Sequence, residues 1–309
     1  MGEKKQHGVV VATRGRLFEV RAEDGDHYHC EVRRRVKGES DRTTPVAVGD
    51  DVEFTRTHEG GGAIDRVIPR RSAFVRPATG DSDVMQVIAA NLDQLAVVTS
   101  VKSPPLKTGL IDRCLIAAYL GSMEPMIVIN KIDLHCDESL EEVIQTYREC
   151  EYAVFPVSAK EGTGLDDLRR ALVDHRTLFA GHSGVGKSTL LNTLIPGLDL
   201  KTLKISQSTK RGRHATTSIE LFELPQGGFV VDSPGLKVMG LWEVTVEELP
   251  HYWPEFEPFA RECRFQPCSH THEPGCAVKK AVRNRRIAQF RWDNYCSIAA
   301  SLTEDARSK

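Results

Sequence analysis

A glycine-rich run with a single lysine carries the strongest chemical signal in the chain. It comprises Gly181, His182, Ser183, Gly184, Val185, Gly186, Lys187, Ser188 and Thr189. Its spacing fits a phosphate-binding loop, in which backbone N–H groups surround phosphate oxygens and the next helix adds a favourable dipole. Lys187 would reach the β- and γ-phosphates, and Ser188 would ligate magnesium. The run therefore predicts a nucleoside triphosphate site that works with Mg²⁺.

Two further motifs indicate which base that site accepts. They are Asn130-Lys131-Ile132-Asp133 and Ser158-Ala159-Lys160. The Asp133 carboxylate can accept bonds from the ring N–H and the exocyclic amine of guanine, a pair of donors that adenine lacks. We expect Asn130 to tie loops together, Lys131 to pack its stem on the base, and the second motif to support guanine through its backbone. These motifs favour GTP (and its product GDP) over ATP.

A fourth motif, Asp232-Ser233-Pro234-Gly235, follows another apolar run. We expect Asp232 to hold magnesium through water and the Gly235 N–H to contact the γ-phosphate. The next residue is Leu236, which cannot orient water. His214 is the best substitute, as a base or as a water positioner, although a contact with a partner alone is the alternative. Thr216 or Thr217 could meet the γ-phosphate and magnesium.

A cluster of three cysteines and one histidine predicts a metal site near the C-terminus. Its members are Cys263, Cys268, His270 and Cys276, with His272 as the rival histidine. Three thiolates and one imidazole within 14 residues match a closed tetrahedral structural zinc site, with no open position for catalysis. The basic run after it would suit phosphate contact; it contains Lys279, Lys280, Arg283, Arg285, Arg286 and Arg291.

The elements that must position these residues change character along the 309-residue chain. The strand patterns Gly8–Thr13, Arg16–Arg21, His27–Arg34, Asp51–Arg56 and Ala63–Ile68 predict a small closed barrel. Its run Arg33-Arg34-Arg35 would suit RNA, although a basic strand that simply faces water is the alternative. From about residue 246 the pattern predicts a small helical module, with one or two basic helices over Val278–Leu302.

Between these parts, apolar strands alternate with helical patterns, which predicts a parallel sheet covered on both faces. The strands are Leu92–Thr99, Met126–Ile129, Tyr152–Val157, Thr177–Ala180 and Phe229–Val231; the helices are Gly109–Leu120, Leu140–Cys150, Leu165–His175 and Lys187–Leu194. The guanine motifs precede the phosphate loop, the reverse of the order in Ras-like enzymes. We infer a circularly permuted GTPase domain. Its last motif runs directly into the C-terminal module, so a γ-phosphate-dependent movement could pass there.

The charge distribution and the composition limit the kinds of partner that we expect. The net charge is -2, yet residues 277–309 carry 8 basic and 3 acidic side chains, and residues 77–200 carry 10 and 17. A polyanion would therefore meet the ends of the chain and the basic loop Lys201–Arg213, not the acidic middle. The chain shows no membrane span, signal peptide or oligomerisation signal, so we expect no membrane partner, a cytoplasmic location and a monomer.

This arrangement of motifs resembles the ribosome small subunit-dependent GTPase A family (RsgA/YjeQ). The resemblance implies an OB-fold barrel over 1–72 that binds ribosomal RNA, a permuted P-loop GTPase domain over 73–245 and a small α-rich zinc domain over 246–309. It implies a bacterial GTPase that acts late in maturation of the small ribosomal subunit and is stimulated by that subunit. The family's switch histidine maps onto His214. Ala215 departs from the family's threonine run, and we favour Thr217 as the magnesium ligand.

Three other functions remain to be separated from this one. Another permuted GTPase could assemble the large subunit, although the N-terminal barrel argues against it. A GTP-gated RNA-binding module would hydrolyse GTP only incidentally. A metal-delivery GTPase would use the Cys/His cluster as a labile metal site.

Overall fold

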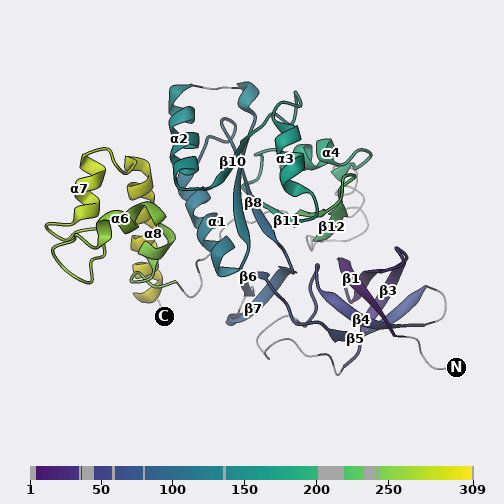
Figure 1. Ribbon diagram of the computed structural model, residues 1–309. Helices are drawn as coiled ribbons and strands as arrows, with labels where there is room; N and C mark the ends of the chain where they lie inside the picture. Colours follow the sequence, from purple (N-terminus) through teal and green to yellow (C-terminus); the bar gives the residue numbers. More distant parts are fainter. Residues whose placement is uncertain are drawn as a thin grey trace.

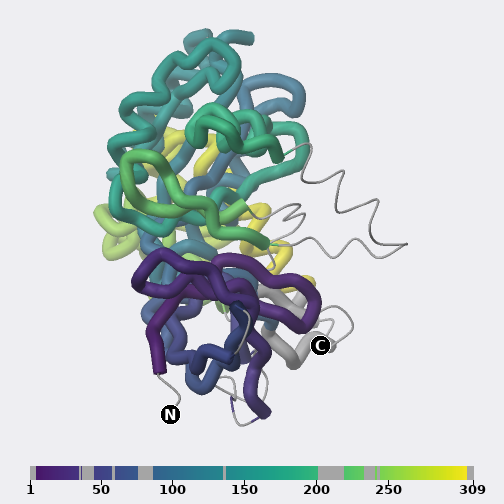
Figure 2. The backbone as a smooth tube through the Cα atoms, turned by 90° about the vertical axis from the view of Figure 1, so that its right-hand side faces the viewer, coloured from purple at the N-terminus to yellow at the C-terminus, as the bar shows by residue number. Residues whose placement is uncertain are grey.

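The computed structural model describes residues 5–34, 36, 45–57, 60–78, 81–134, 137–200, 219–232, 241 and 244–307. Within these ranges an N-terminal barrel lies at one end of a layered α/β unit, and a helical module lies against one side of that unit (Figure 1). Figure 2, turned by 90°, again shows the barrel at one end of the molecule. His214, Thr216, Thr217 and Gly235 lie outside the described residues.

Five short strands close into the predicted barrel. They are β1 (Lys5–Arg14), β2 (Leu17–Ala22), β3 (His27–Val32), β4 (Asp51–Arg56) and β5 (Gly61–Val67). The pairing runs β1-β2-β3-β5-β4 and returns to β1, with only β3 and β5 parallel. Alternate side chains point inward, as the two-residue period of a strand requires, and Val20, Phe54 and Ile64 are fully buried in the core.

A hairpin that the sequence analysis did not anticipate leads out of the barrel. It consists of β6 (Ala73–Ala78) and β7 (Asp81–Ala90), paired antiparallel. At its end the Ala90 N–H donates to the Val48 carbonyl at 2.8 Å, so the hairpin is anchored on the barrel before the chain enters the central sheet.

The central sheet has the predicted parallel arrangement. The strands β8 (Gln94–Ser100), β9 (Glu124–Asn130), β10 (Ala153–Pro156), β11 (Arg176–Ala180) and β13 (Phe229–Asp232) are parallel in the order β10-β9-β8-β11-β13. An additional antiparallel strand, β12 (Glu220–Glu223), follows β13 at the edge. It pairs with β1 of the barrel at Ala12 and Glu220, so the two sheets join.

Helices cover both faces of this sheet. One face packs against α1 (Thr108–Leu120) and α2 (Glu138–Glu149), the other against α3 (Leu165–Leu172) and α4 (Lys187–Leu194). Strand β8 is buried along its whole length because both of its faces are covered. The helix expected over Leu165–His175 ends earlier, since Val173 is extended and Asp174 has a positive φ of 59°. A short turn, η1 (Ile132–Leu134), follows β9.

The C-terminal module contains two helices where the sequence predicts one or two over Val278–Leu302. Its elements are η2 (Leu249–Tyr252), η3 (Pro254–Phe256), α6 (Glu257–Ala260), α7 (Ala277–Arg283) and α8 (Gln289–Arg307). Trp253, Phe256 and Tyr295 stack edge to face or tilted at its centre, with centroids 5.0–6.3 Å apart. Helix α8 packs on α1, so the module is docked on the central α/β unit.

Candidate functional site

The phosphate-binding loop lies where the sequence predicts it, between the end of β11 and the start of α4. Two of its glycines have no room for a side chain. A Cβ on Gly181 would lie 2.0 Å from the Val98 carbonyl oxygen, and one on Gly186, where φ is 95°, would lie 2.4 Å from Asn130 Nδ2. The Lys187 ammonium is buried inside the loop and donates to the carbonyls of Gly181 at 2.6 Å and His182 at 3.1 Å.

Asn130 joins the three predicted motifs at one point. Its Nδ2 donates to the Val185 carbonyl of the phosphate loop at 3.0 Å. Its Oδ1 accepts from the N–H of Lys131 at 2.8 Å and from the N–H of Ala159 at 3.0 Å. This buried amide has both of its polar atoms satisfied, which fixes the relative positions of the three loops. The expectation that Asn130 ties loops together is confirmed.

The predicted guanine end of the site is also assembled. The buried Ser158 hydroxyl donates to Asp133 Oδ1 at 2.6 Å and accepts from the Glu161 N–H at 3.1 Å. Ser158 therefore orients the Asp133 carboxylate, a role that the motif pattern alone did not reveal. The Lys131 ammonium donates to the carbonyls of Gly184, at 2.6 Å, and Ser103. Ile132 lies beside them in η1, and Lys160 is exposed.

Asp232 ends β13, which neighbours the loop-bearing strand β11. It is 4% exposed and lies opposite Phe179 in the parallel register. Because carboxyl ends of parallel strands share one edge, Asp232, the phosphate loop with Ser188, and the Asp133 loop all meet at that edge. Of the loop residues, Gly184 and Val185 contact the guanine motifs, whereas His182, Ser183 and Thr189 are exposed.

The four predicted metal ligands converge in the C-terminal module. The ligand atoms of Cys263, Cys268, His270 and Cys276 all lie within 4.8 Å of one another. Cys263 Sγ lies 3.8 Å from Cys276 Sγ, and His270 Nδ1 lies 3.6 Å and 3.5 Å from these two sulfurs. A tetrahedral centre with metal–sulfur bonds of about 2.3 Å spaces its sulfurs by about 3.8 Å. His272 is 84% exposed and is not among these four converging residues.

Helix α8 is hydrogen-bonded to the loop that carries the predicted metal ligand His270. Trp292 Nε1 donates to the His270 carbonyl at 3.0 Å, and the Tyr295 hydroxyl donates to the Ser269 carbonyl at 2.7 Å. Burial raises the pKa of Cys268 to about 12 and also raises the pKa of Cys276, whereas it lowers the pKa of His270. Buried thiols of this kind become thiolates when a bound cation compensates their negative charge. This set of three thiols and one imidazole suits such a cation.

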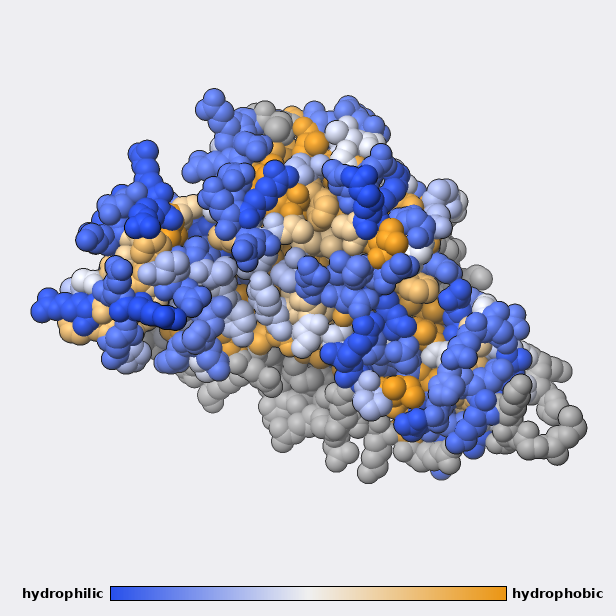
Figure 3. Space-filling model, viewed as in Figure 1, coloured by the Kyte–Doolittle hydropathy of each residue, from blue (hydrophilic) through white to orange (hydrophobic). Residues whose placement is uncertain are grey.

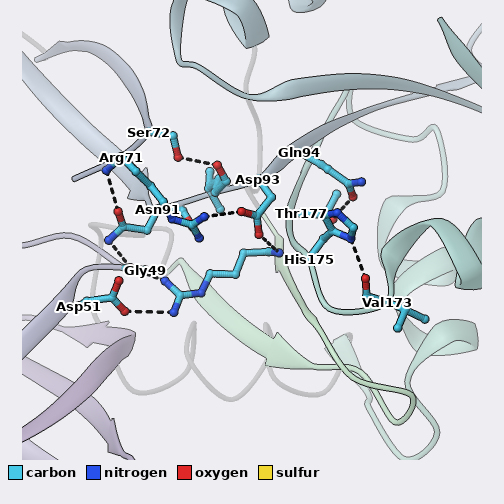
Figure 4. A network of polar contacts seen from close by, with 12 residues as sticks. Gly49, Asp51, Arg71, Ser72, Asn91, Asp93, Gln94, Val173, His175 and Thr177 are labelled. Carbon is cyan, nitrogen blue, oxygen red and sulfur yellow. Dashed lines mark hydrogen bonds and ion pairs between the residues drawn. The ribbon is translucent and has the colours of Figure 1, made fainter. Parts of the chain in front are cut away.

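The structure also reveals a polar junction between barrel and sheet that the sequence analysis missed. Arg176 begins β11; its guanidinium donates to Asp51 Oδ1 at 3.0 Å and to the Gly49 carbonyl at 3.2 Å. Its backbone N–H donates to Asp93 at 2.7 Å, and Asp93 also pairs with Arg71. Figure 4 shows these carboxylates and arginines converging where the two units meet. Strand β11 therefore carries the phosphate loop at its carboxyl end and is hydrogen-bonded to the barrel at its amino end.

The predicted basic surfaces are only partly available to phosphates. Arg291 is 1% exposed and pairs with Asp112 of α1 and, through two bonds, with Glu255. The prediction of phosphate contact is wrong for Arg291, because it is itself buried and already paired with two acidic side chains distant in sequence. In the barrel, Arg33 pairs with Asp65 at 2.9 Å while Arg34 is exposed. The remaining arginines of the C-terminal run, Arg283, Arg285 and Arg286, are exposed.

Comparison with known proteins agrees with this geometry. The family described as RsgA GTPase matches residues 67–242. A small ribosomal subunit biogenesis GTPase RsgA of Chlorobaculum tepidum is 41% identical over 305 residues, covering 96% of this chain and 98% of the relative. One of Bacteroides fragilis is 37% identical over 301 residues, covering 96% and 97%.

Solved structures match along the whole chain as well. The crystal structure of YjeQ from Thermotoga maritima has a TM-score of 0.77 and 33% identity, and the match covers 97% of this chain and 99% of that one. YloQ, described as a circularly permuted GTPase, has a TM-score of 0.71 and 27% identity, with 98% and 96% covered. The predicted circular permutation is confirmed. No described helix is long and apolar enough to span a bilayer.

Proposed function

The chain belongs to the RsgA GTPase family and is a GTPase, and from that premise we propose that it hydrolyses GTP late in maturation of the small ribosomal subunit. The observation that carries the proposal is the bonding of Asn130 to the phosphate loop, to Lys131 and to Ala159. It assembles one site for a guanine base and a triphosphate. The name of the Chlorobaculum relative supplies the biological setting.

In this proposal the described side chains divide the work of binding between the two ends of the nucleotide. Asp133, oriented by Ser158, accepts the two guanine donors, and the stem of Lys131 packs on the base. The backbone of residues 181–186 encloses the phosphates. Lys187 exchanges its two carbonyl partners for phosphate oxygens, which carry more negative charge. Nucleotide binding would thus give the Lys187 ammonium stronger hydrogen-bond acceptors than the two carbonyls.

Two metal sites complete the proposal. Ser188, Thr217 and, through water, Asp232 would hold Mg²⁺, which when bound neutralises charge on the β- and γ-phosphates. Cys263, Cys268, His270 and Cys276 would hold one structural Zn²⁺. Closed coordination by four protein ligands favours a structural role over metal delivery. The Gly235 N–H would contact the γ-phosphate, and His214 would position or deprotonate the attacking water.

We assign ribosomal RNA contact to the barrel, where Arg34 is exposed, and, in the basic run after the metal loop, to the exposed Lys280. The domain division that fits this assignment is 1–72, 73–245 and 246–309. Leu241 and Val244, just before the last boundary, pack into the core of the C-terminal module, which supports transmission of nucleotide state to that module. We propose a cytoplasmic location, because the proposed partner is the small ribosomal subunit. We also propose a monomer, because no oligomerisation signal stands out in the sequence.

A His214→Ala variant separates a hydrolytic timer from a GTP-gated RNA-binding module. If hydrolysis times release, the variant loses most of its stimulated hydrolysis and stays on small subunits after GTP addition, as measured by sedimentation. Wild-type protein with a non-hydrolysable GTP analogue should behave in the same way. Normal release by the variant despite blocked hydrolysis would contradict the timer and favour the GTP-gated module.

A further inference from the structure

A groove with a volume of about 950 Å³ separates α2 of the GTPase unit from the C-terminal module. Phe259, Val282 and Ile287 contribute apolar atoms to its lining. Figure 3 shows a small hydrophobic area between hydrophilic side chains where these two parts meet. The groove lies away from the nucleotide and metal sites, so neither function described above accounts for it.

The two rims of the groove carry opposite charge. Glu142 and Glu149, two turns apart on α2, form one rim, and Arg283, Arg285 and Arg286 form the other. All five side chains are exposed. Within the described ranges neither glutamate pairs with a cation and none of the three arginines pairs with a carboxylate; Arg286 stacks on Phe259 with 4.8 Å to the ring centroid. Each rim therefore retains charge that a partner can neutralise.

Arg285 has a left-handed backbone conformation that arginine rarely adopts. It has a φ of 56°, and its N–H donates to the Val282 carbonyl at 2.9 Å, which closes the end of α7. Glycine or asparagine is the usual residue at such a left-handed helix end, because other side chains are strained there. The residue in this strained conformation is an arginine whose side chain lines the groove.

We propose that this groove binds a polypeptide segment that carries both acidic and basic side chains, in the small-subunit particle to which the chain is proposed to bind. Acidic groups of the segment pair with the arginine rim and basic groups with the glutamate rim, while apolar side chains cover the partly buried Phe259. RNA fits less well, because a phosphate backbone in the groove would be repelled by Glu142 and Glu149. The inference rests on the proposed function, since it names a protein contact within that particle.

Charge reversal on each rim distinguishes a peptide from RNA. The variants are Arg285→Glu and Glu149→Lys, and affinity for purified small subunits is measured with a non-hydrolysable GTP analogue. Matched controls are Arg261→Glu, in the same module, and Glu141→Lys, on the same helix; both residues are exposed and neither lines the groove. We expect both rim variants to weaken binding at least tenfold, with the controls within twofold of wild type. Unchanged melting temperature and zinc content identify variants that remain folded.

Other results overturn the proposal. Weaker binding by Arg285→Glu together with tighter binding by Glu149→Lys indicates RNA in the groove. Affinities within twofold of wild type for both rim variants indicate that nothing occupies it. A photoreactive side chain at Gln145, which lines the groove, should cross-link to a ribosomal protein; cross-links to RNA alone contradict the assignment. If wild-type protein itself fails to bind small subunits, the proposed function falls first and this contact falls with it.

Discussion

The Arg176 guanidinium donates to the Asp51 carboxylate at 3.0 Å across the junction between the central sheet and the barrel. Arg176 begins β11, and the same strand ends in the phosphate-binding loop. Two further bonds, to the Gly49 carbonyl and from the Arg176 N–H to Asp93, fix the strand at this end. The RNA contact proposed for the barrel would therefore be connected to the nucleotide site through strand β11.

An Arg176→Ala variant should lose coupling between barrel and nucleotide site while retaining the site itself. Basal GTP hydrolysis should stay within about twofold of wild type, because the phosphate loop is about 15 Å away along β11 at 3.3 Å per residue. Stimulation by small subunits should fall about tenfold, which corresponds to about 1.4 kcal/mol of coupling. Arg170→Ala, which removes an exposed helix arginine, is the control. Full stimulation of the Arg176 variant would contradict the connection.

Substitution of Gly186 by alanine should abolish nucleotide binding without unfolding the chain. The added Cβ would lie 2.4 Å from Asn130 Nδ2, at a φ of 95°, so the amide that joins the three motifs must move. Gly197→Ala is the matched control, since Gly197 also has a positive φ, 84°, but has no atom within 4 Å of its would-be Cβ. Isothermal titration with GDP measures both. Equal affinities for the two variants would show that the Asn130 contact does not organise the site.

Base selectivity should follow Asp133. In Asp133→Asn an amide donor faces the guanine donors, so affinity for GTP should drop at least about 100-fold, and xanthosine triphosphate, which has a carbonyl in place of the amine, should bind better. Ser158→Ala removes the 2.6 Å bond to Asp133 and should cost about tenfold. Competition against a fluorescent guanine nucleotide measures both effects. An Asp133 variant with wild-type preference for GTP would place guanine elsewhere.

The buried pair Asp112–Arg291 should be a large contributor to stability. Both side chains are 1% exposed, and Tyr147 and Asn294 also donate to Asp112. Asp112→Ala removes one partner of a buried ion pair and should lower the free energy of unfolding by about 3–5 kcal/mol in urea titrations. Asp167→Ala breaks an exposed pair with Arg170 and should cost at most about 1 kcal/mol. Comparable decreases in the free energy of unfolding for the two variants would show that burial does not determine how much an ion pair contributes to stability.

Metal affinity should rise steeply with pH. Burial raises the pKa of Cys268 to about 12 and raises the pKa of Cys276, so both thiols are protonated at pH 7 before metal binds. Binding of Zn²⁺ displaces at least these two protons, and the apparent affinity should increase about 100-fold per pH unit between pH 6 and 8. His270 adds little, because burial lowers its pKa. Competition with a chelator at several pH values measures the slope, and a flat profile would contradict thiolate ligation.

The sequence predicts the site well because its signals are local. A phosphate loop, its flanking strand and its helix lie within 20 residues. Two of its glycines, Gly181 and Gly186, leave no room for a side chain, and the third, Gly184, has a positive φ of 86°. The hairpin β6–β7 was not predicted, and its first strand contains Pro77, a residue type that rarely occurs inside a sheet. Proline is tolerated there because both strands of a two-stranded sheet are edge strands.

Long-range partners set the limit of sequence-based prediction. Nothing near Arg291 distinguishes it from Arg285 or Arg286, and its partner Asp112 lies 179 residues away. One arginine enters the core and the others stay at the surface because of where α8 meets α1. Arg176 likewise gains its role only when β11 reaches the barrel. His270, which the sequence analysis preferred to its rival His272, lies with the three cysteines in the folded loop.

The most direct test of the account is GTP hydrolysis by the purified protein alone, with small ribosomal subunits and with large ones, at two salt concentrations. The account predicts slow hydrolysis alone, strong stimulation by small subunits only, and a loss of stimulation at higher salt because phosphate contacts are screened. Slow hydrolysis that neither subunit changes at either salt concentration would contradict it.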